Sequence, residues 1–283
     1  MLGGMSVMAA VISIWLAAHA NYGAHHDVYL MLGSFLGVLR DGAYAPSRFT
    51  GYPVAEIGVG ASAWAGGSSL SNLVNYGLFL GSVLLFPLCF QRKIEPERYL
   101  AFSAISLSST VMAFDNIMSI DYPWSLFFWV LGCVCLRHSR DRMLALIPMA
   151  LSIGSRPVFA VFVVVSILLV DAEPTDTSAR LWQRVQTRWQ AIAATIFCGG
   201  LFYLPAWFQD HFGLSWISAV GPDNQGLWGL IARFVYKLVL ALGITQTAVV
   251  VALLILLTIR RRKRQIPATN MNQVESRFLL TVA

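Results

Sequence analysis

Charged residues are scarce in this 283-residue chain, at 12% against roughly 25% in an ordinary soluble domain. Hydrophobic residues reach 57%, and the mean hydropathy is +0.65. This shortage of charge argues against a water-soluble domain and predicts an all-α integral membrane protein. Lys and Arg outnumber Asp and Glu by 20 to 14. Because cytoplasmic loops of membrane proteins are basic in any case, this excess gives no reason to expect a nucleic-acid partner.

Several signals of other protein classes are also missing. The four cysteines all lie within apolar runs, so neither a disulfide framework nor a zinc site is indicated. His25, His26 and His211 do not have the spacing of a metal site. The sequence has no internal repeat, low-complexity segment or heptad array. The first apolar run has no basic segment before it and no small-residue cleavage site before Asn21, so we expect a retained helix rather than a signal peptide.

Long apolar runs predict the membrane helices, since about 20 residues cross a hydrocarbon core of about 30 Å. The run Met143–Val170 is interrupted by Gly154-Ser-Arg-Pro157, which fits either a kink in one helix or the turn of a hairpin of two short helices. The other predicted spans are Leu2–Ala20, Leu70–Phe90, Tyr99–Phe114, Tyr122–Leu136, Gln190–Phe208 and Ile231–Ile259.

The basic residues decide between a kink and a hairpin. A hairpin places four basic clusters on one side of the membrane, and these clusters hold 14 of the 20 basic residues: Arg92, Lys93 and Arg98; Arg137, Arg140 and Arg142; Arg180, Arg184 and Arg188; and residues 260–264. A single span would divide the clusters between the two sides and break the positive-inside rule. We therefore predict about eight membrane helices in a multi-pass protein of the cell membrane, with both termini cytoplasmic.

This topology places four irregular segments on the outer face, namely residues 27–69, 115–121, 155–157 and 209–229. Residues 171–188 are expected to form a short amphipathic helix along the cytoplasmic interface. Residues 1–264 form the predicted transmembrane domain, and 265–283 a cytoplasmic tail that ends like the start of a truncated ninth helix.

The stretch His25–Ile57 carries the first candidate for chemistry. Asp27 follows the first predicted helix, and the apolar segment Val28–Leu39 is too short to span the membrane but suits an interfacial helix. Such a helix would hold Asp27 over a cavity, where its carboxylate could accept a proton from a hydroxyl group. A solvated carboxylate at a helix end is the simpler alternative. Residues 44–53 contain two prolines and several aromatics, which predict an irregular loop.

Three motifs resemble the GT-C superfamily of membrane glycosyltransferases, such as protein O-mannosyltransferases and aminoarabinose transferases. The first is His26-Asp27 followed by Gly42-Ala-Tyr44 and Ser47-Arg48-Phe-Thr-Gly-Tyr52-Pro53, similar to the first outer loop of that family. The second is Asp121-Tyr-Pro, similar to its second outer loop, and the third is Gly154-Ser-Arg156-Pro157, similar to a turn between two short helices. The motifs occur in the family's order over about the first 170 residues.

The resemblance implies a sugar donor linked to polyprenyl phosphate and an acceptor glycan, lipid or protein with a free hydroxyl group. Asp27 would be the general base of an inverting transfer, and His26, Arg48, Tyr52, Asp121 and Arg156 would bind substrate. Arginine suits the phosphate leaving group because its planar fork binds two oxygens. No cofactor is implied. A divalent metal is not expected, because the His26–Asp27 pair has one carboxylate where many members of the family have two.

Each of these residues also has a structural reading. Arg48 and Arg156 could snorkel or pair with Glu56 or Asp121. Asp121 could cap a helix that has Pro123 in its first turn. Tyr44, Tyr52 and Trp64 could belong to an interfacial aromatic belt.

At the level of function, the alternatives are a transporter or flippase, and a non-catalytic subunit or fragment. Transporters usually place ionisable residues at the membrane midplane and contain related halves, and neither feature is visible in this sequence.

Overall fold

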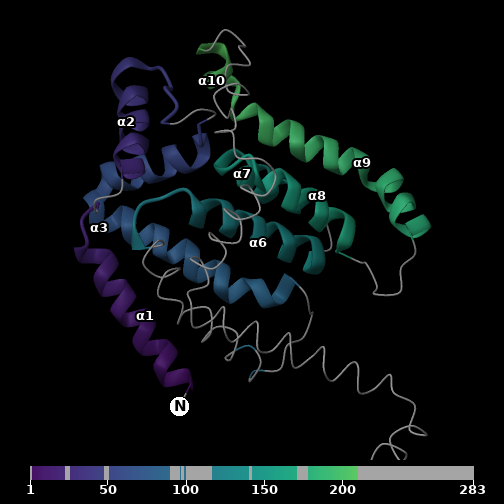
Figure 1. Cartoon of the computed structure of the whole chain (residues 1–283), viewed down its shortest axis with the longest axis horizontal. Coiled ribbons are helices and arrows are strands. Elements are labelled where there is room, and N and C mark those ends of the chain that lie inside the picture. The colour runs from purple at the N-terminus through teal and green to yellow at the C-terminus, as the bar shows by residue number, and fades with distance from the viewer. Residues whose placement is uncertain are drawn as a thin grey trace, which may run out of the picture. The chain divides into compact units, whose positions relative to one another are not determined.

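The computed structural model describes residues 2–22, 26–47, 51–89, 96, 99, 117–139, 142–170 and 178–209. All regular structure in this part of the chain is helical, with no strand (Figure 1). The helices are α1 (Leu2–His19), α2 (His26–Asp41), α3 (Pro53–Leu85), η1 (Phe86–Cys89), α6 (Tyr122–His138), η2 (Arg142–Ala145), α7 (Leu146–Ser155), α8 (Phe159–Leu169), α9 (Ser178–Leu201) and α10 (Leu204–Gln209).

The first two helices confirm the predicted order of an apolar helix followed by a second helix. α1 ends near Asn21, whose positive φ of 52° is a conformation that Asn tolerates. α2 has an acidic residue in its first turn and Arg40 in its last, as the helix dipole favours. It buries Val28, Met31 and Ser34 and ends at Asp41, just before Gly42, which has a φ of 64°. The predicted helix over Val28–Leu39 is therefore present.

α3 corrects the prediction for residues 54–69, which were assigned to an outer loop. The helix begins at Pro53, a residue favoured in the first turn, and is broken only at Gly66 and Gly67. Gly67 has φ 66° and ψ −161°, a combination open essentially to glycine alone. The glycine-rich first half is helical because it packs closely on its neighbours. A Cβ at Gly60 would lie 2.1 Å from Phe35 of α2.

α7 and α8 confirm the hairpin of two short helices. α7 starts after the C-terminal end of α6 and packs along that helix. At its far end, Arg156 forms an ion pair with Asp121, which immediately precedes α6. α8 then runs back toward the C-terminal end of α6. There, Arg137 in the last turn of α6 donates to the carbonyl of Val170, just after α8, at a distance of 3.1 Å. Met149, Ile153, Val163 and Ile167 share one buried core with α6.

α9 is one helix in a region where two separate elements were predicted. The amphipathic linker helix over residues 171–188 and the span Gln190–Phe208 were expected to be separate. The structure instead shows a continuous helix from Ser178 to Leu201, followed by the short α10. Arg188 reaches from α9 to the carbonyl of Ile167 in α8, so the polar and apolar parts of the helix are both packed beside the hairpin.

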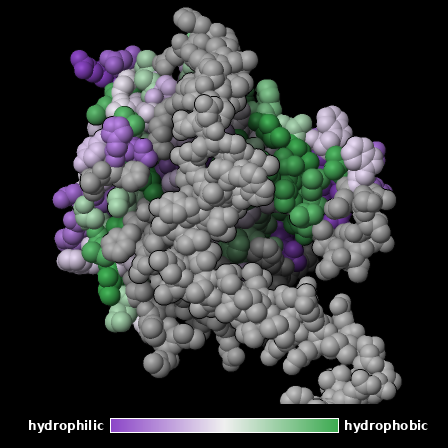
Figure 2. Space-filling model, in the orientation of Figure 1, coloured by the Kyte–Doolittle hydropathy of each residue, from purple (hydrophilic) through white to green (hydrophobic). Residues whose placement is uncertain are grey.

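One helical segment of the described part of the chain, Pro53–Cys89, is long and apolar enough to cross a membrane. Shorter apolar helices cover Ala10–His19, Met143–Ser155 and Phe159–Leu169. Hydrophobic residues lie at the surface over α8 and the adjoining part of α9 (Figure 2). Two predicted spans lie outside the described residues: Ile231–Ile259, and Tyr99–Phe114 apart from its first residue. The tail 265–283 also lies outside them. The eight-helix topology therefore remains a prediction.

Candidate functional site

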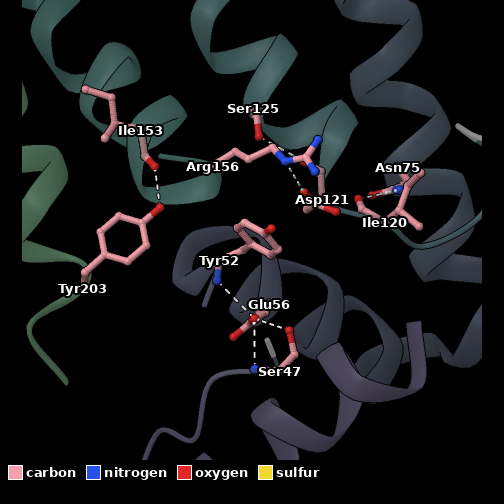
Figure 3. Close-up of polar contacts among 10 residues, drawn as sticks. All are labelled: Ser47, Tyr52, Glu56, Asn75, Ile120, Asp121, Ser125, Ile153, Arg156 and Tyr203. Atoms are coloured by element: carbon pink, nitrogen blue, oxygen red, sulfur yellow. Dashed lines mark hydrogen bonds and ion pairs between the residues drawn. The ribbon is translucent and has the colours of Figure 1, made fainter. Parts of the chain in front are cut away.

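Arg156 lies at the turn between α7 and α8, where the chain leaves helical geometry. Its backbone is extended, with φ −162° and ψ 117°, as expected for a residue before proline. Its Nε atom lies 3.1 Å from Oδ2 of Asp121 (Figure 3). The Asp121 side chain is only 1% exposed and that of Arg156 is 18% exposed. Arg156 is therefore the more exposed partner of this largely buried ion pair.

Two tyrosine rings flank the Arg156 guanidinium. Its central carbon lies 3.7 Å from the ring centre of Tyr122 and 5.5 Å from that of Tyr52. Both distances are within the range of cation–π attraction, which strengthens when the cation is partly desolvated. Tyr122 begins α6 and Tyr52 precedes α3, so Arg156 connects the starts of two helices that are distant in the sequence.

Glu56 forms a second buried centre beneath Tyr52 (Figure 3). The backbone N–H groups of Ser47 and Tyr52 donate to its Oε1 at 3.2 and 3.1 Å. The Ser47 hydroxyl also donates to Oε1, and the Tyr44 hydroxyl donates to Oε2. Burial and the neighbouring negative charge of Glu56 raise the pKa of Tyr44, so this phenol stays protonated as a donor.

Asn75 fixes the segment that leads to Asp121. Its Nδ2 donates to the carbonyls of Met118 and Ile120 at 2.5 and 2.9 Å, while its Oδ1 accepts from the indole of Trp124 at 2.7 Å. Asn75 is fully buried in α3, so these contacts hold the start of α6 against α3. The carboxylate of Asp121 is thereby presented to Arg156.

α7 is anchored at the same end of α6 by two further contacts. The buried Tyr203 donates its hydroxyl to the carbonyl of Ile153 at 2.6 Å. Gly154 lies so close to Phe202 and Val54 that a Cβ would come within 2.6 and 2.7 Å of their side chains. The absence of a side chain at Gly154 thus lets α7 approach α3, and this close packing restricts movement of the turn at Arg156.

The structure brings together three of the six predicted site residues, Tyr52, Asp121 and Arg156. His26 and Asp27 instead begin α2, with His26 exposed and Asp27 half-buried. The opposite end of α2, which leads to the loop before Tyr52, is about 21 Å from Asp27 along the helix axis at 1.5 Å per residue. Arg48 lies outside the described residues.

Sequence reasoning missed the roles of Glu56 and Asn75. Glu56 was considered only as a partner for an arginine, whereas it accepts hydrogen bonds from the loop before α3. The signal that was available is its position, because it is the one acidic residue between Asp41 and Glu95. Asn75 gave no comparable signal. Trp64, considered for an interfacial aromatic belt, is 76% exposed.

Within the described residues, no three His, Cys, Asp or Glu side chains are grouped so that they could hold a metal ion. No protein-family model, curated protein or solved structure matches the chain. The functional argument therefore depends on the sequence motifs and on where the structure places them.

Proposed function

We propose that the chain is a GT-C-type glycosyltransferase that moves a sugar from a polyprenyl-phosphate donor to an acceptor hydroxyl group. One observation carries this proposal. The loop ending at Tyr52, the Asp121-Tyr-Pro segment and the Gly154-Ser-Arg156-Pro turn were selected separately for their resemblance to the family, and they meet around Arg156. Motifs more than 100 residues apart in the sequence thus contribute to one cluster.

The proposed chemistry is an inverting displacement at the anomeric carbon. Asp27, assigned by resemblance and not by a contact with the Arg156 cluster, takes the proton of the acceptor hydroxyl as its oxygen bonds to that carbon. The bond from the anomeric carbon to the phosphate oxygen breaks, and the electron pair leaves with the polyprenyl phosphate. Arg156, and Arg48 by resemblance, stabilise the charge of this leaving group. His26, Tyr52 and Asp121 bind or orient the substrates. No metal or cofactor is part of the proposed reaction.

We place the site at the extracytoplasmic face of the cell membrane, in a multi-pass protein with both termini cytoplasmic. The α7–α8 hairpin supports this orientation, since it puts the turn at Arg156 beside Asp121 and the basic end of α6, at Arg137, at the opposite end of that helix. Positive charge at the end away from the proposed site agrees with the positive-inside rule. The exposed apolar residues of α1 and α8 would face lipid.

The test is transfer of radiolabelled sugar from a panel of polyprenyl-phosphate donors in membranes that contain the chain. Asp27→Asn should lower the rate by at least about 100-fold, the usual contribution of a general base, without loss of membrane insertion. Asp41→Asn is the matched control, because Asp41 ends the same helix and its side chain is 66% exposed. It should leave the rate unchanged.

Two other results would change the interpretation. Transfer that persists in Asp27→Asn would remove this carboxylate from the mechanism but keep the enzyme class. A folded, inserted wild-type chain that transfers sugar from none of the donors would favour the alternatives of a transporter, flippase or non-catalytic membrane subunit.

A further inference from the structure

The loop between α2 and α3 is built around a single carboxylate. Four donors from Tyr44, Ser47 and Tyr52 point at Glu56, which lies in the first turn of α3 and has no exposed surface. A carboxylate has about four lone-pair positions, and this one is the acceptor for all four donors, three of which converge on Oε1 while one reaches Oε2. Two of them are backbone N–H groups in a segment without regular structure, where each needs an acceptor once it is buried.

The described residues on the two sides of this loop also pack closely against each other. Gly51 has a φ of 69°, and a Cβ added there would lie 2.5 Å from the Tyr44 hydroxyl and 2.9 Å from Cβ of Pro46. The two ends of the loop therefore touch each other as well as Glu56. Tyr52, the last residue of the loop, is held by its N–H to Oε1 and contributes the ring that faces Arg156.

We propose that Glu56 is a positioning residue for the phosphate of the lipid-linked donor. It does not contact the donor in this proposal, which rests on the assignment of Arg156 to the phosphate group. Its Oε1 fixes Tyr52, the Tyr52 ring limits where the Arg156 guanidinium can lie, and Asp121 holds the guanidinium from the other side. Oε2 holds Tyr44 at the start of the loop, farther along the chain from Tyr52.

Because Oε1 and Oε2 of Glu56 bind different parts of the loop, variants that affect one or both oxygens can be compared in one experiment with an internal control. Glu56→Ala removes all four acceptor positions, Glu56→Gln keeps one acceptor oxygen, and Tyr44→Phe removes only the contact with Oε2. Amide hydrogen exchange at Ser47 and Tyr52 reports on the loop directly, and binding of sugar-free polyprenyl phosphate to the detergent-solubilised chain reports on the phosphate site.

We expect exchange at both amides to rise in the order wild type, Glu56→Gln, Glu56→Ala. Polyprenyl phosphate binding should weaken by about tenfold in Glu56→Ala, the factor of one charge-assisted hydrogen bond. Tyr44→Phe should leave both amides protected and binding near the wild-type value. If Glu56→Ala does not fold, Glu56→Gln against Tyr44→Phe gives the same comparison.

Unchanged exchange in the Glu56 variants would overturn the role of Glu56 in the loop. Faster exchange with unaltered lipid binding would overturn its role in positioning, and so would a wild-type chain that does not bind the lipid. A wild-type chain that binds polyprenyl phosphate but transfers no sugar would refute the proposed reaction and leave the positioning role intact.

Discussion

At the residue scale, the two partners of the ion pair between Arg156 and Asp121 differ in how deeply they are buried. The Asp121 side chain is 1% exposed, whereas 18% of Arg156 is exposed and its guanidinium also lies 3.7 Å from the Tyr122 ring centre. Loss of the arginine removes the ion pair from a carboxylate that is almost fully buried. Loss of the aspartate leaves a guanidinium that still lies over an aromatic face, on a side chain that is 18% exposed.

We therefore expect Arg156→Gln to lower the free energy of unfolding by about 3–5 kcal/mol, the usual cost of breaking a buried pair. Asp121→Asn should cost clearly less. Chemical denaturation of the purified chain in detergent, followed by circular dichroism, measures both values. An equal or larger cost for Asp121→Asn would show that the aspartate is not the more dependent partner. The double variant should cost less than the sum of the two single variants.

Both members of this pair were recognisable in the sequence because charge is rare in so apolar a chain. Their pairing appeared there only as one alternative, since Arg156 could equally have paired with Glu56 or snorkelled. What decides the outcome is the position of α3 relative to α6 and α7, which Asn75 and the close contact at Gly154 fix through long-range packing. No local sequence pattern contains that information.

At the element scale, the kink of α3 depends on Gly67. Its φ of 66° and ψ of −161° are strained for any residue with a Cβ, so Gly67→Ala should lower the free energy of unfolding by about 1–3 kcal/mol. Gly77 is the matched control, since it lies in the same helix and a Cβ there meets nothing within 4 Å. Gly77→Ala should be neutral or stabilise the chain by up to about 1 kcal/mol.

Thermal unfolding of the two alanine variants, measured side by side, distinguishes a required kink from a flexible one. Equal stability of Gly67→Ala and Gly77→Ala would mean that α3 can straighten without cost.

Helix existence was easier to predict than helix boundaries. α1, α2, α6 and the α7–α8 hairpin follow from apolar runs, prolines and the placement of basic residues. The first half of α3 was missed because its glycines and small residues give little hydrophobic signal. Phe35 and Trp124 pack directly onto Gly60 and Gly58, and these long-range contacts leave no local pattern in the sequence. α9 was divided in two because its polar first half was taken for an interfacial linker.

At the scale of the whole molecule, the proposed topology predicts the side from which residues can be labelled. Single cysteines at Ala45 and Val158, both exposed, should react with a membrane-impermeant maleimide added to the extracytoplasmic side. A cysteine at Met143, which is 64% exposed near the opposite end of α6, should react only after the membrane is permeabilised. The four native cysteines are replaced in this experiment. Labelling of Ala45 and Val158 from different sides would refute the topology.

The α7–α8 hairpin has a consequence for the lipid around it. α7 has 10 residues and α8 has 11, so their lengths are about 15 and 17 Å, roughly half the thickness of a hydrocarbon core. Inserted beside the longer helices, such a pair would force the adjoining leaflet to thin, at a cost of a fraction of a kcal/mol per Å of mismatch. Headgroups there would sit deeper than elsewhere in the bilayer. A phosphate attached to a long isoprenoid chain could then meet the turn between the two helices without leaving its own leaflet.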